Sequence, residues 1–355
     1  MAKYPYIVQT LRQRILNGDY NITSFPAEAV LATEFDVSYM TARRAVQALV
    51  QEGLIHRRPY GAVEINRDAN SGGLHMQIAY LMPTFPSEQF QRWMRAISTV
   101  ANEQGLLVRV VQYTHWNDPI LTDTIDRFDG VFLFPTTEPI PPHVAQRLKA
   151  AQRLVALDSD LSELGIPSLR LIAPERIHAL LDHLRDRGYQ RIDYLNTQPV
   201  DALHAEIVEQ YELWLRQHQY AGQLRNCPVS PYGSGLIQAY EVMRDLLASG
   251  SFTATALVCT PFPGALGAIR ALYEAGMHVG SDVGVCAFCG EGTAAYHVPS
   301  ITTLHDPDFA PYVRPCIEWM QGKREWDGPL VMLIDDIPVC CGESTNPQMA
   351  VPIRA

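Results

Sequence analysis

Along residues 36–55, DVSYMTARRAVQALVQEGLI, apolar residues recur at steps of three and four positions, which predicts an α-helix with one buried stripe. The stripe consists of Ala42, Ala45, Val46, Leu49 and Val50. The opposite front of the helix carries Tyr39, Met40, Arg43, Arg44 and Gln47. Ser38 is the expected N-cap, and Gly53 is the expected left-handed residue that ends the helix.

Two shorter helices and a hairpin are predicted around this helix. Apolar spacing predicts a helix at about 6–17 and another at about 27–34, after Pro26. Short strands are expected at 54–55 and 62–65, and the tip between them reads Arg57-Arg58-Pro59-Tyr60-Gly61. A short second helix, a tight turn and a third helix with a polar front are typical of helix-turn-helix geometry, and the basic hairpin would be its wing.

The pattern changes after residues 66–73, NRDANSGG, which have the polar, non-periodic composition of a linker. Continuous apolar runs then alternate with helical segments. The runs are 76–82, 106–111, 130–134, 154–157, 191–195, 256–260 and 283–288, and the helices are 88–104, 141–151, 174–187, 205–218, 235–249 and 264–275. Buried strands that alternate with helices predict parallel sheets covered on both faces, with ligands at the carboxyl ends of the strands. We therefore expect an α/β chain with a winged helix-turn-helix domain at 1–66, a linker at 67–74 and a larger domain at 75–355.

Charge separates the same two parts of the chain. The 355 residues carry a net charge of −10, yet residues 1–67 hold eight Lys and Arg against six Asp and Glu. Only the N-terminal part is therefore expected to meet a polyanion. Exposed arginines are most often simply solvated, but Arg43 and Arg44 lie beside a Ser/Thr front and a basic hairpin, which favours DNA. Because there is neither an 18-residue apolar run nor a signal-like N-terminus, we expect a cytoplasmic protein without membrane segments.

The sequence offers little support for a metal centre or catalysis, so we expect no cofactor and no enzyme activity. Seven cysteines lie mostly in apolar runs and are expected to be reduced and buried. Cys286 and Cys289 have zinc-ligand spacing that Cys340-Cys341 could complete, but structural zinc ligands normally follow turns. His178 and Asp182 lie four apart without a third ligand in view, and no nucleophile elbow or phosphate-binding loop is present in the sequence.

The N-terminal sequence resembles the winged-helix domain of the gluconate-repressor (GntR) superfamily. The resemblance rests on LRQRILNGDY and on FPAEAVLATEFDVSYMTARRAVQALVQEGLI. It implies that Ser38, Thr41 and Arg43 touch phosphates or base edges and that Gly61 is a wing glycine. Tyr39 stands where the family usually has arginine, and Arg57-Arg58-Pro59-Tyr60-Gly61-Ala62 replaces a glycine-rich tip. The complete expected DNA-binding set is Ser38, Tyr39, Thr41, Arg43, Arg44, Gln47, Arg57, Arg58, Tyr60 and Gly61.

The larger domain resembles the periplasmic-binding-protein-like effector domain of the lactose-repressor (LacI) family. The resemblance rests on FDGVFLFP, LVALDSD, HLRDRGYQRIDYL, ALGAIRALYEAGMHVGSDVGVCAF, PSITTLHDP and IDDIPVCCGEST, in that order. It implies one lobe at about 75–172 and 300–330 and a second at about 173–299 and 331–355. Three crossovers would join the lobes, which would hinge around a small molecule.

By the same resemblance, the expected effector site differs from that of sugar-binding members. Ile207 replaces an arginine, Pro261-Phe262 replaces an Asn-Asp pair and Cys289 replaces an aspartate, whereas Asp158 keeps an acidic position. Sugar hydroxyls need polar partners, because an unpaired buried polar group costs about 1–3 kcal/mol. The expected effector site consists of Thr84, Phe85, Phe90, Thr136, Asp158, Ile207, Phe262 and Cys289.

Two functions fit these expectations. The first is a DNA-binding transcriptional regulator, a repressor by preference, that forms a homodimer on a near-palindromic operator and senses a small molecule other than an ordinary sugar. In the second, the C-terminal domain senses nothing and only pairs two DNA-binding domains.

Overall fold

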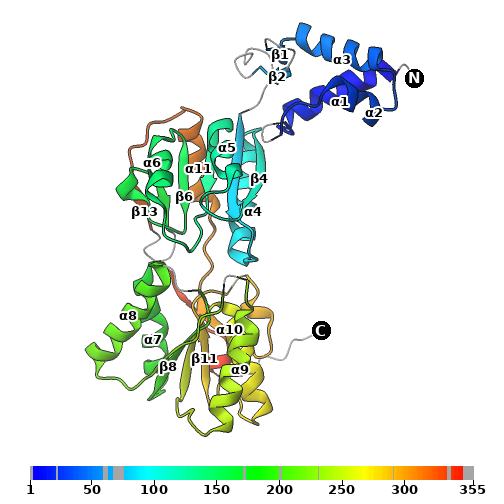
Figure 1. Ribbon diagram of the computed structural model, residues 1–355. Helices are drawn as coiled ribbons and strands as arrows, with labels where there is room; N and C mark the ends of the chain where they lie inside the picture. The colour runs from blue at the N-terminus through cyan, green and yellow to red at the C-terminus, as the bar shows by residue number, and fades with distance from the viewer. Residues whose placement is uncertain are drawn as a thin grey trace.

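The computed structural model describes residues 3–20, 23–58, 63–66, 76–170, 173–199, 202–230, 232–290, 292–333 and 337–346. The described chain forms an N-terminal unit followed by two α/β lobes (Figure 1). The predicted linker, 67–74, lies outside the described residues, so its limits stay a prediction.

The N-terminal unit packs three helices beside a two-stranded hairpin. Its elements are α1 (Lys3–Leu16), α2 (Glu28–Glu34), α3 (Tyr39–Gln51), β1 (Ile55–Arg57) and β2 (Val63–Ile65). β1 and β2 pair antiparallel, with Ile55 opposite Ile65. Four residues of the predicted α3 stripe are buried in one core with Leu11 and Leu31, whereas Val50 is half-buried. Gly53 ends the helix with a positive φ of 73°. One shared apolar core therefore holds this small unit together.

The first lobe is a six-stranded sheet with the order β13-β7-β6-β5-β3-β4. Its strands are β3 (Gln77–Pro83), β4 (Leu107–Tyr113), β5 (Gly130–Leu133), β6 (Leu154–Leu157), β7 (Ser168–Leu169) and β13 (Val331–Met332). All the pairings in this sheet are parallel. Helices cover both of its faces. They are α4 (Glu88–Glu103), α5 (Pro119–Arg127), α6 (Pro142–Ala150) and α11 (Ala310–Met320).

The second lobe repeats this architecture with the order β14-β12-β11-β10-β8-β9. Its strands are β8 (Ile192–Asn196), β9 (Leu224–Asn226), β10 (Ala256–Thr260), β11 (Gly284–Ala287), β12 (Thr302–Leu304) and β14 (Val339–Cys340). Its helices are α7 (Ile177–Asp186), α8 (Ala202–His218), α9 (Gly235–Ala248) and α10 (Phe262–Glu274). Only the edge pair β12–β14 is antiparallel among the described strands of this sheet.

One apolar core connects the two lobes. It contains side chains of α4 and α11 from the first lobe and of α7 and α8 from the second. The remaining face of each sheet has a core of its own, under α5 and α6 in the first lobe and under α9 and α10 in the second. Each sheet is thus buried on both faces, which explains why its strands read as continuous apolar runs.

The pairing of the late strands differs from the lobe limits expected from the sequence. β12 pairs with β11, so residues 302–304 belong to the second sheet rather than to the first lobe. β13 pairs with β7, so residues 331–332 belong to the first sheet rather than to the second lobe. Two crossovers therefore fall between Leu304 and Ala310 and between Met332 and Val339. These strands are only two or three residues long, and such short segments carry no periodic signal.

None of the described helices combines the length and the apolar composition needed to cross a bilayer.

Candidate DNA-binding surface and effector site

The exposed front of α3 carries the candidate base-reading side chains. Ser38 caps the helix, because its Oγ accepts a hydrogen bond of 3.3 Å from the backbone N–H of Thr41, as predicted from the sequence. The two hydroxyls also lie 2.9 Å apart. Arg43, Arg44 and Gln47 are exposed on the same helix. Within the described part of the chain, neither Arg43 nor Arg44 makes an ion pair or a side-chain hydrogen bond, so both guanidinium groups are available to a ligand.

Glu28 connects α2, α3 and the hairpin. Its Oε2 accepts a hydrogen bond of 2.6 Å from the hydroxyl of Tyr39, and its Oε1 forms an ion pair with Arg57. Burial favours the neutral form of Glu28, but the bonds from Tyr39 and Arg57 outweigh it and lower the pKa of this carboxyl. No local pattern indicates this contact, since the three residues are far apart in the chain. Glu28 was not among the expected DNA-binding residues.

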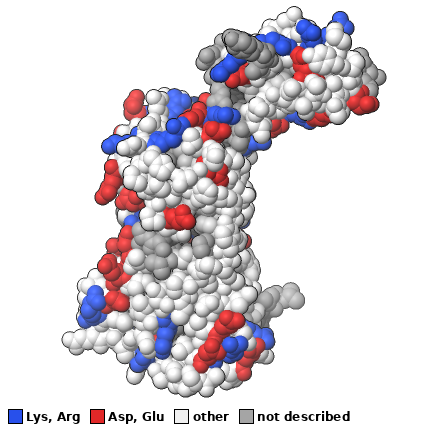
Figure 2. Space-filling view, viewed as in Figure 1, with Lys and Arg blue, Asp and Glu red and all other residues white. Residues whose placement is uncertain are grey.

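The hairpin arginines are both paired in the free protein. Arg57 contacts Glu28, and Arg58 forms an ion pair of 2.6 Å with Glu64 on the opposite strand. The side chain of Arg58 is 63% exposed, so this pair is open to solvent. Tyr60 and Gly61, which are also expected to contact DNA, lie outside the described residues. Figure 2 shows basic side chains along the outer edge of this unit, over α3.

In the first lobe, Asp158 follows β6 and lies against the start of α4. Its Oδ2 accepts hydrogen bonds from Gln89 Nε2 at 2.8 Å and from Trp93 Nε1 at 2.9 Å. Asp158 also has a positive φ of 51°, which aspartate tolerates better than most residues. The carboxylate is thus fixed in position at the carboxyl end of a parallel strand, where α/β sheets bind ligands.

Aromatic rings surround this end of the first sheet. The Phe85 and Phe90 ring centroids lie 5.2 Å apart, and those of Phe90 and Phe134 lie 4.6 Å apart. Phe90 is only 2% exposed and belongs to the core, whereas Phe85 and Phe134 are half-buried. Of the three rings, Phe85 and Phe134 are therefore the ones that a ligand could reach.

The two expected threonines have partners of their own. Thr84 Oγ1 lies 2.8 Å from the hydroxyl of Tyr232, which precedes α9 in the second lobe. Thr136 Oγ1 accepts a bond of 3.1 Å from the backbone N–H of Glu138 in its own loop. The Thr84–Tyr232 contact joins the two lobes at the carboxyl ends of their sheets. The sequence did not predict Tyr232 as part of the site.

Two of the three expected second-lobe residues are more deeply buried than a contact with a ligand requires. Ile207 is 1% exposed and packs in the core beside Tyr211. Phe262 is 2% exposed and meets His297 edge-on, with ring centroids 5.4 Å apart. Cys289 is half-buried. The structure therefore does not gather Ile207 and Phe262 with the aromatic rings of the first lobe.

Arg92 is a polar residue of this region that the sequence analysis missed. It is 9% exposed, lies over the ring of Phe309 and forms an ion pair of 3.2 Å with Asp306. Asp306 in turn accepts a bond of 2.8 Å from the backbone N–H of Gly292. These contacts run from α4 of the first lobe to the loop after β11 in the second. Nothing in the sequence around Arg92 indicates a contact with Asp306, which lies 214 positions further along the chain.

Among the described residues, no three His, Cys, Asp or Glu side chains are grouped as metal ligands. Cys286 is fully buried between strands, and burial raises the pKa of its thiol well above the ordinary value. Cys340 and Cys341 are exposed, not buried as expected, because β14 is an edge strand. Their sulfurs lie 3.6 Å from His305 Nδ1 and 3.7 Å from His183 Nδ1, respectively.

A helix-turn-helix unit with a two-stranded hairpin, followed by two α/β lobes, is typical of ligand-responsive DNA-binding proteins. Comparison with known families agrees with this architecture. Residues 3–65 match the bacterial regulatory proteins of the gntR family, and residues 181–321 match the periplasmic binding protein-like domain. The chain is a bacterial transcriptional regulator in which a gntR-family DNA-binding domain is fused to a periplasmic binding protein-like domain. Both resemblances inferred from the sequence are thereby confirmed.

Named relatives cover either the whole chain or the N-terminal unit. The chain is 23% identical over 350 residues to the arabinose metabolism transcriptional repressor of Halalkalibacterium halodurans, and the match covers 92% of each protein. It is 46% identical over 59 residues to the HTH-type transcriptional regulator GmuR of Bacillus subtilis, which covers 16% of this chain and 25% of that protein.

Solved structures show the same fold. The lac repressor dimer bound to operator and the anti-inducer ONPF matches with a TM-score of 0.63 and 19% identity, over 79% of this chain and 98% of that one. A LacI family regulator from Enterococcus faecium with bound ribose matches with a TM-score of 0.64 and 20% identity, over 76% of this chain and 99% of that one. The expected fold of parallel-sheet lobes is confirmed.

Proposed function

We propose that this regulator is a repressor that inserts α3 into the major groove of its operator. The observation that supports this most strongly is the exposed front of α3. It carries two unpaired guanidinium groups and the amide of Gln47 on a helix held by Ser38 at its N-terminus. Arginine recognises guanine edges with two hydrogen bonds, and glutamine recognises adenine in the same way. The remaining expected residues, Tyr39 and Thr41, lie on the first turn of the helix.

The hairpin is proposed to contact phosphates. Arg57 and Arg58 already have carboxylate partners, Glu28 and Glu64. On DNA each guanidinium would bind a phosphate oxygen, either in place of its carboxylate partner or together with it. Phosphate contacts of this kind strengthen binding to every sequence alike and set the salt dependence of affinity.

The operator-bound form is proposed to be a homodimer on a near-palindrome. One winged helix buries too little surface for tight specific binding. The second lobe exposes apolar side chains that a partner could cover: Ile237 is 55% exposed, Tyr273 72%, Tyr296 86% and Val298 94%. Ile237 belongs to α9 and Tyr273 to α10, which pack side by side, and the other two lie in the loop before β12. Exposed apolar side chains gathered on neighbouring elements are typical of interaction surfaces.

The proposed effector has an apolar or aromatic part and one cationic or hydroxyl group that faces Asp158. Phe85 and Phe134 supply the apolar surface, and Asp158 supplies the fixed charge. One relative is named for arabinose metabolism and one matched structure holds ribose, but both are under 25% identical to this chain. The rings of Phe85 and Phe134 offer no hydrogen bonds, so an ordinary sugar would lose water there without gaining partners.

The alternative function keeps DNA binding but gives the lobes no ligand. Several contacts already join them, such as Thr84 with Tyr232, so the lobes could serve as a rigid dimerisation platform. A thermal-shift screen of the full chain against a metabolite panel separates the two functions. A ligand at 100 times its Kd should add about 2.7 kcal/mol of stability to the wild type and much less to Asp158→Asn, whereas a platform gains no stability that depends on Asp158.

DNA binding is tested independently of the effector. An operator is selected from random-sequence DNA, and the affinity of the full chain is then measured by fluorescence anisotropy. The proposal expects one enriched near-palindrome and a large preference for it over scrambled DNA. Enrichment of no sequence at all would contradict it.

A further inference from the structure

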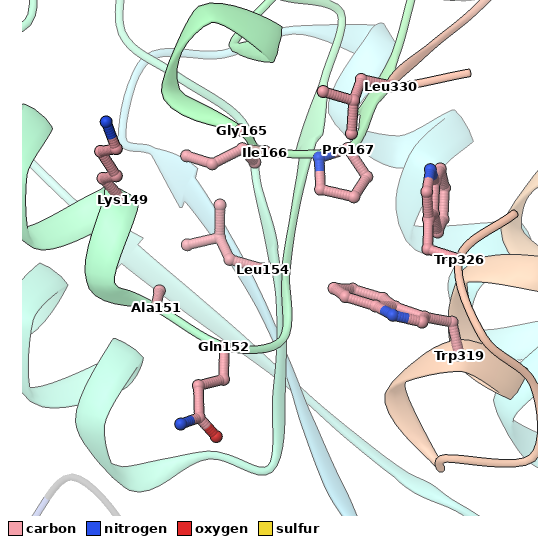
Figure 3. A pocket seen from close by; sticks show the side chains of 10 residues that line it. All are labelled: Lys149, Ala151, Gln152, Leu154, Gly165, Ile166, Pro167, Trp319, Trp326 and Leu330. Carbon is pink, nitrogen blue, oxygen red and sulfur yellow. The ribbon is translucent and has the colours of Figure 1, made fainter. Parts of the chain in front are cut away.

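A small pocket opens in the first lobe, away from the candidate effector site. It has a volume of about 140 Å³ and lies where β6 and β7 begin, at the opposite end of the sheet from Asp158. Trp319 and Trp326 form one wall with ring centroids 5.5 Å apart, and Leu154, Ile166 and Pro167 form the floor (Figure 3). A dry cavity of about 150 Å³ accommodates one benzene ring, so this pocket has the size for a single aromatic ring.

The rim of the pocket is positively charged. Lys149, at the end of α6, lines it on the side opposite the indole rings (Figure 3). Lys149 is one of only three lysines in the chain and makes no ion pair among the described residues. A wider hollow of about 530 Å³ adjoins the pocket and shares Ala151, Gln152 and Leu154 with it. Arg153 lines this hollow and likewise lacks an ion pair within the described chain.

The Nε1 of Trp326 is buried and donates to no acceptor within the described residues. Because this atom is closed to solvent, Trp326 contributes its apolar ring to the pocket rather than its N–H. An aromatic wall, an apolar floor and Lys149 at the rim together favour a flat apolar ring with a negative charge.

We propose that this pocket is a second small-molecule site and that it binds a small aromatic carboxylate. The ring lies between the indoles and the Leu154 floor, and the carboxylate faces Lys149. The site is separate from the proposed effector site and does not depend on it. Its occupation connects β6 and β7 with the segment from Trp319 to Leu330, which leads into β13. Binding therefore stabilises the first lobe.

The test is fluorine NMR of the full chain labelled with 5-fluorotryptophan and titrated with sodium benzoate. The five tryptophans give separate reporters, assigned by Trp→Phe replacements. Trp319 and Trp326 report on the pocket, and Trp93 reports on the effector site through its bond to Asp158. We expect saturable shifts at Trp319 and Trp326 with a Kd near or below about 1 mM, which is modest for a ligand of this size. Benzamide should bind more weakly than benzoate, and benzylamine should bind most weakly.

Two variants with matched controls test the contacts. Lys149→Gln should weaken benzoate by roughly two- to fivefold, as expected for an exposed ion pair, whereas Lys323→Gln should not. Ala151→Phe should fill the pocket and abolish the shifts, whereas Ala150→Phe, one residue away on the exposed end of α6, should keep them. The proposal fails if benzoate shifts Trp93 alone, if no resonance saturates, if benzylamine binds as well as benzoate, or if the Lys149 and Lys323 variants behave alike.

Discussion

The hydroxyl of Tyr39 donates a hydrogen bond of 2.6 Å to Glu28, the first residue of α2. The same carboxylate pairs with Arg57 in the hairpin. One acidic side chain thus contacts both the start of α3 and a hairpin arginine that we propose as a phosphate contact. Tyr39, which the resemblance to the winged-helix family places at a position usually held by arginine, thus bonds to Glu28 while its side chain stays 48% exposed.

Glu28→Gln should release Arg57 and strengthen binding to DNA of any sequence. Each added phosphate contact changes the slope of log affinity against log salt by about −0.9, so the slope should become steeper by up to about one such contact. Anisotropy titrations at several salt concentrations measure it. Glu34→Gln is the matched control, because Glu34 pairs with Arg14 away from the hairpin. Equal slopes for the two variants would show that Glu28 does not restrain Arg57.

Stability should fall in mild acid because of His183. Burial and the neighbouring Arg187 lower the pKa of His183 to about 4, from an ordinary value of 6.5. The His183 ring also contacts Thr345 and Cys341. Asp186 raises the pKa of His183, but by less than burial and Arg187 lower it. The unfolded chain therefore binds more protons at His183 than the folded chain does between pH 4 and 6.5. The contribution of His183 to stability is complete above this window and is lost as the pH falls through it.

Inside this window, one such group changes the free energy of unfolding by up to about 1.4 kcal/mol per pH unit. Urea unfolding of the wild type and of His183→Gln at several pH values measures its share. The variant should lose part of the dependence, whereas His143→Gln, an exposed histidine on α6, should keep it. Parallel curves for wild type and His183→Gln would contradict the assignment.

Val298→Glu should weaken the homodimer without disturbing the fold. Val298 is 94% exposed, so a charge there meets only solvent in the single chain, but it would be buried in the proposed interface. Sedimentation without DNA should show at least a tenfold larger dissociation constant, a loss of about 1.4 kcal/mol. Val30→Glu on α2, where the side chain is 56% exposed, is the control. A monomeric wild type at micromolar concentration, or an unchanged Val298→Glu dimer, would count against this surface.

Asp158→Asn should weaken the effector without unfolding the first lobe. The amide oxygen of asparagine can still accept from Trp93, but the negative charge facing the ligand is lost. Calorimetry with the compound found in the thermal-shift screen should show roughly a tenfold loss, as for a charged hydrogen bond of about 1.5 kcal/mol. Asp160→Asn removes a nearby exposed carboxylate that caps Ser162. If both variants bind alike, Asp158 does not face the ligand.

Phe262 does not offer a useful test of the effector site. At 2% exposure it belongs to the core under α9 and α10, so an aspartate there would place a charge among apolar side chains. Lost binding would then report unfolding rather than recognition.

Most of the fold could be predicted from local patterns, whereas contacts between residues far apart in the sequence could not. The cap at Ser38, the stripe of α3 and the buried strands follow from spacing within a few residues. β9 was missed because its three residues, Leu-Arg-Asn, alternate too briefly to show a period. The partners of Glu28, Asp158 and Arg92 come from other elements, so no local pattern could indicate them.

The central claim is that α3 reads the operator through Arg43. The most direct measurement is the affinity of Arg43→Ala for the selected operator and for scrambled DNA, beside Arg95→Ala, which removes an exposed arginine on α4. The claim predicts that Arg43→Ala loses about 1–3 kcal/mol on the operator and much less on scrambled DNA, while Arg95→Ala keeps the wild-type affinity. Wild-type affinity and salt slope for Arg43→Ala on both DNAs would contradict it.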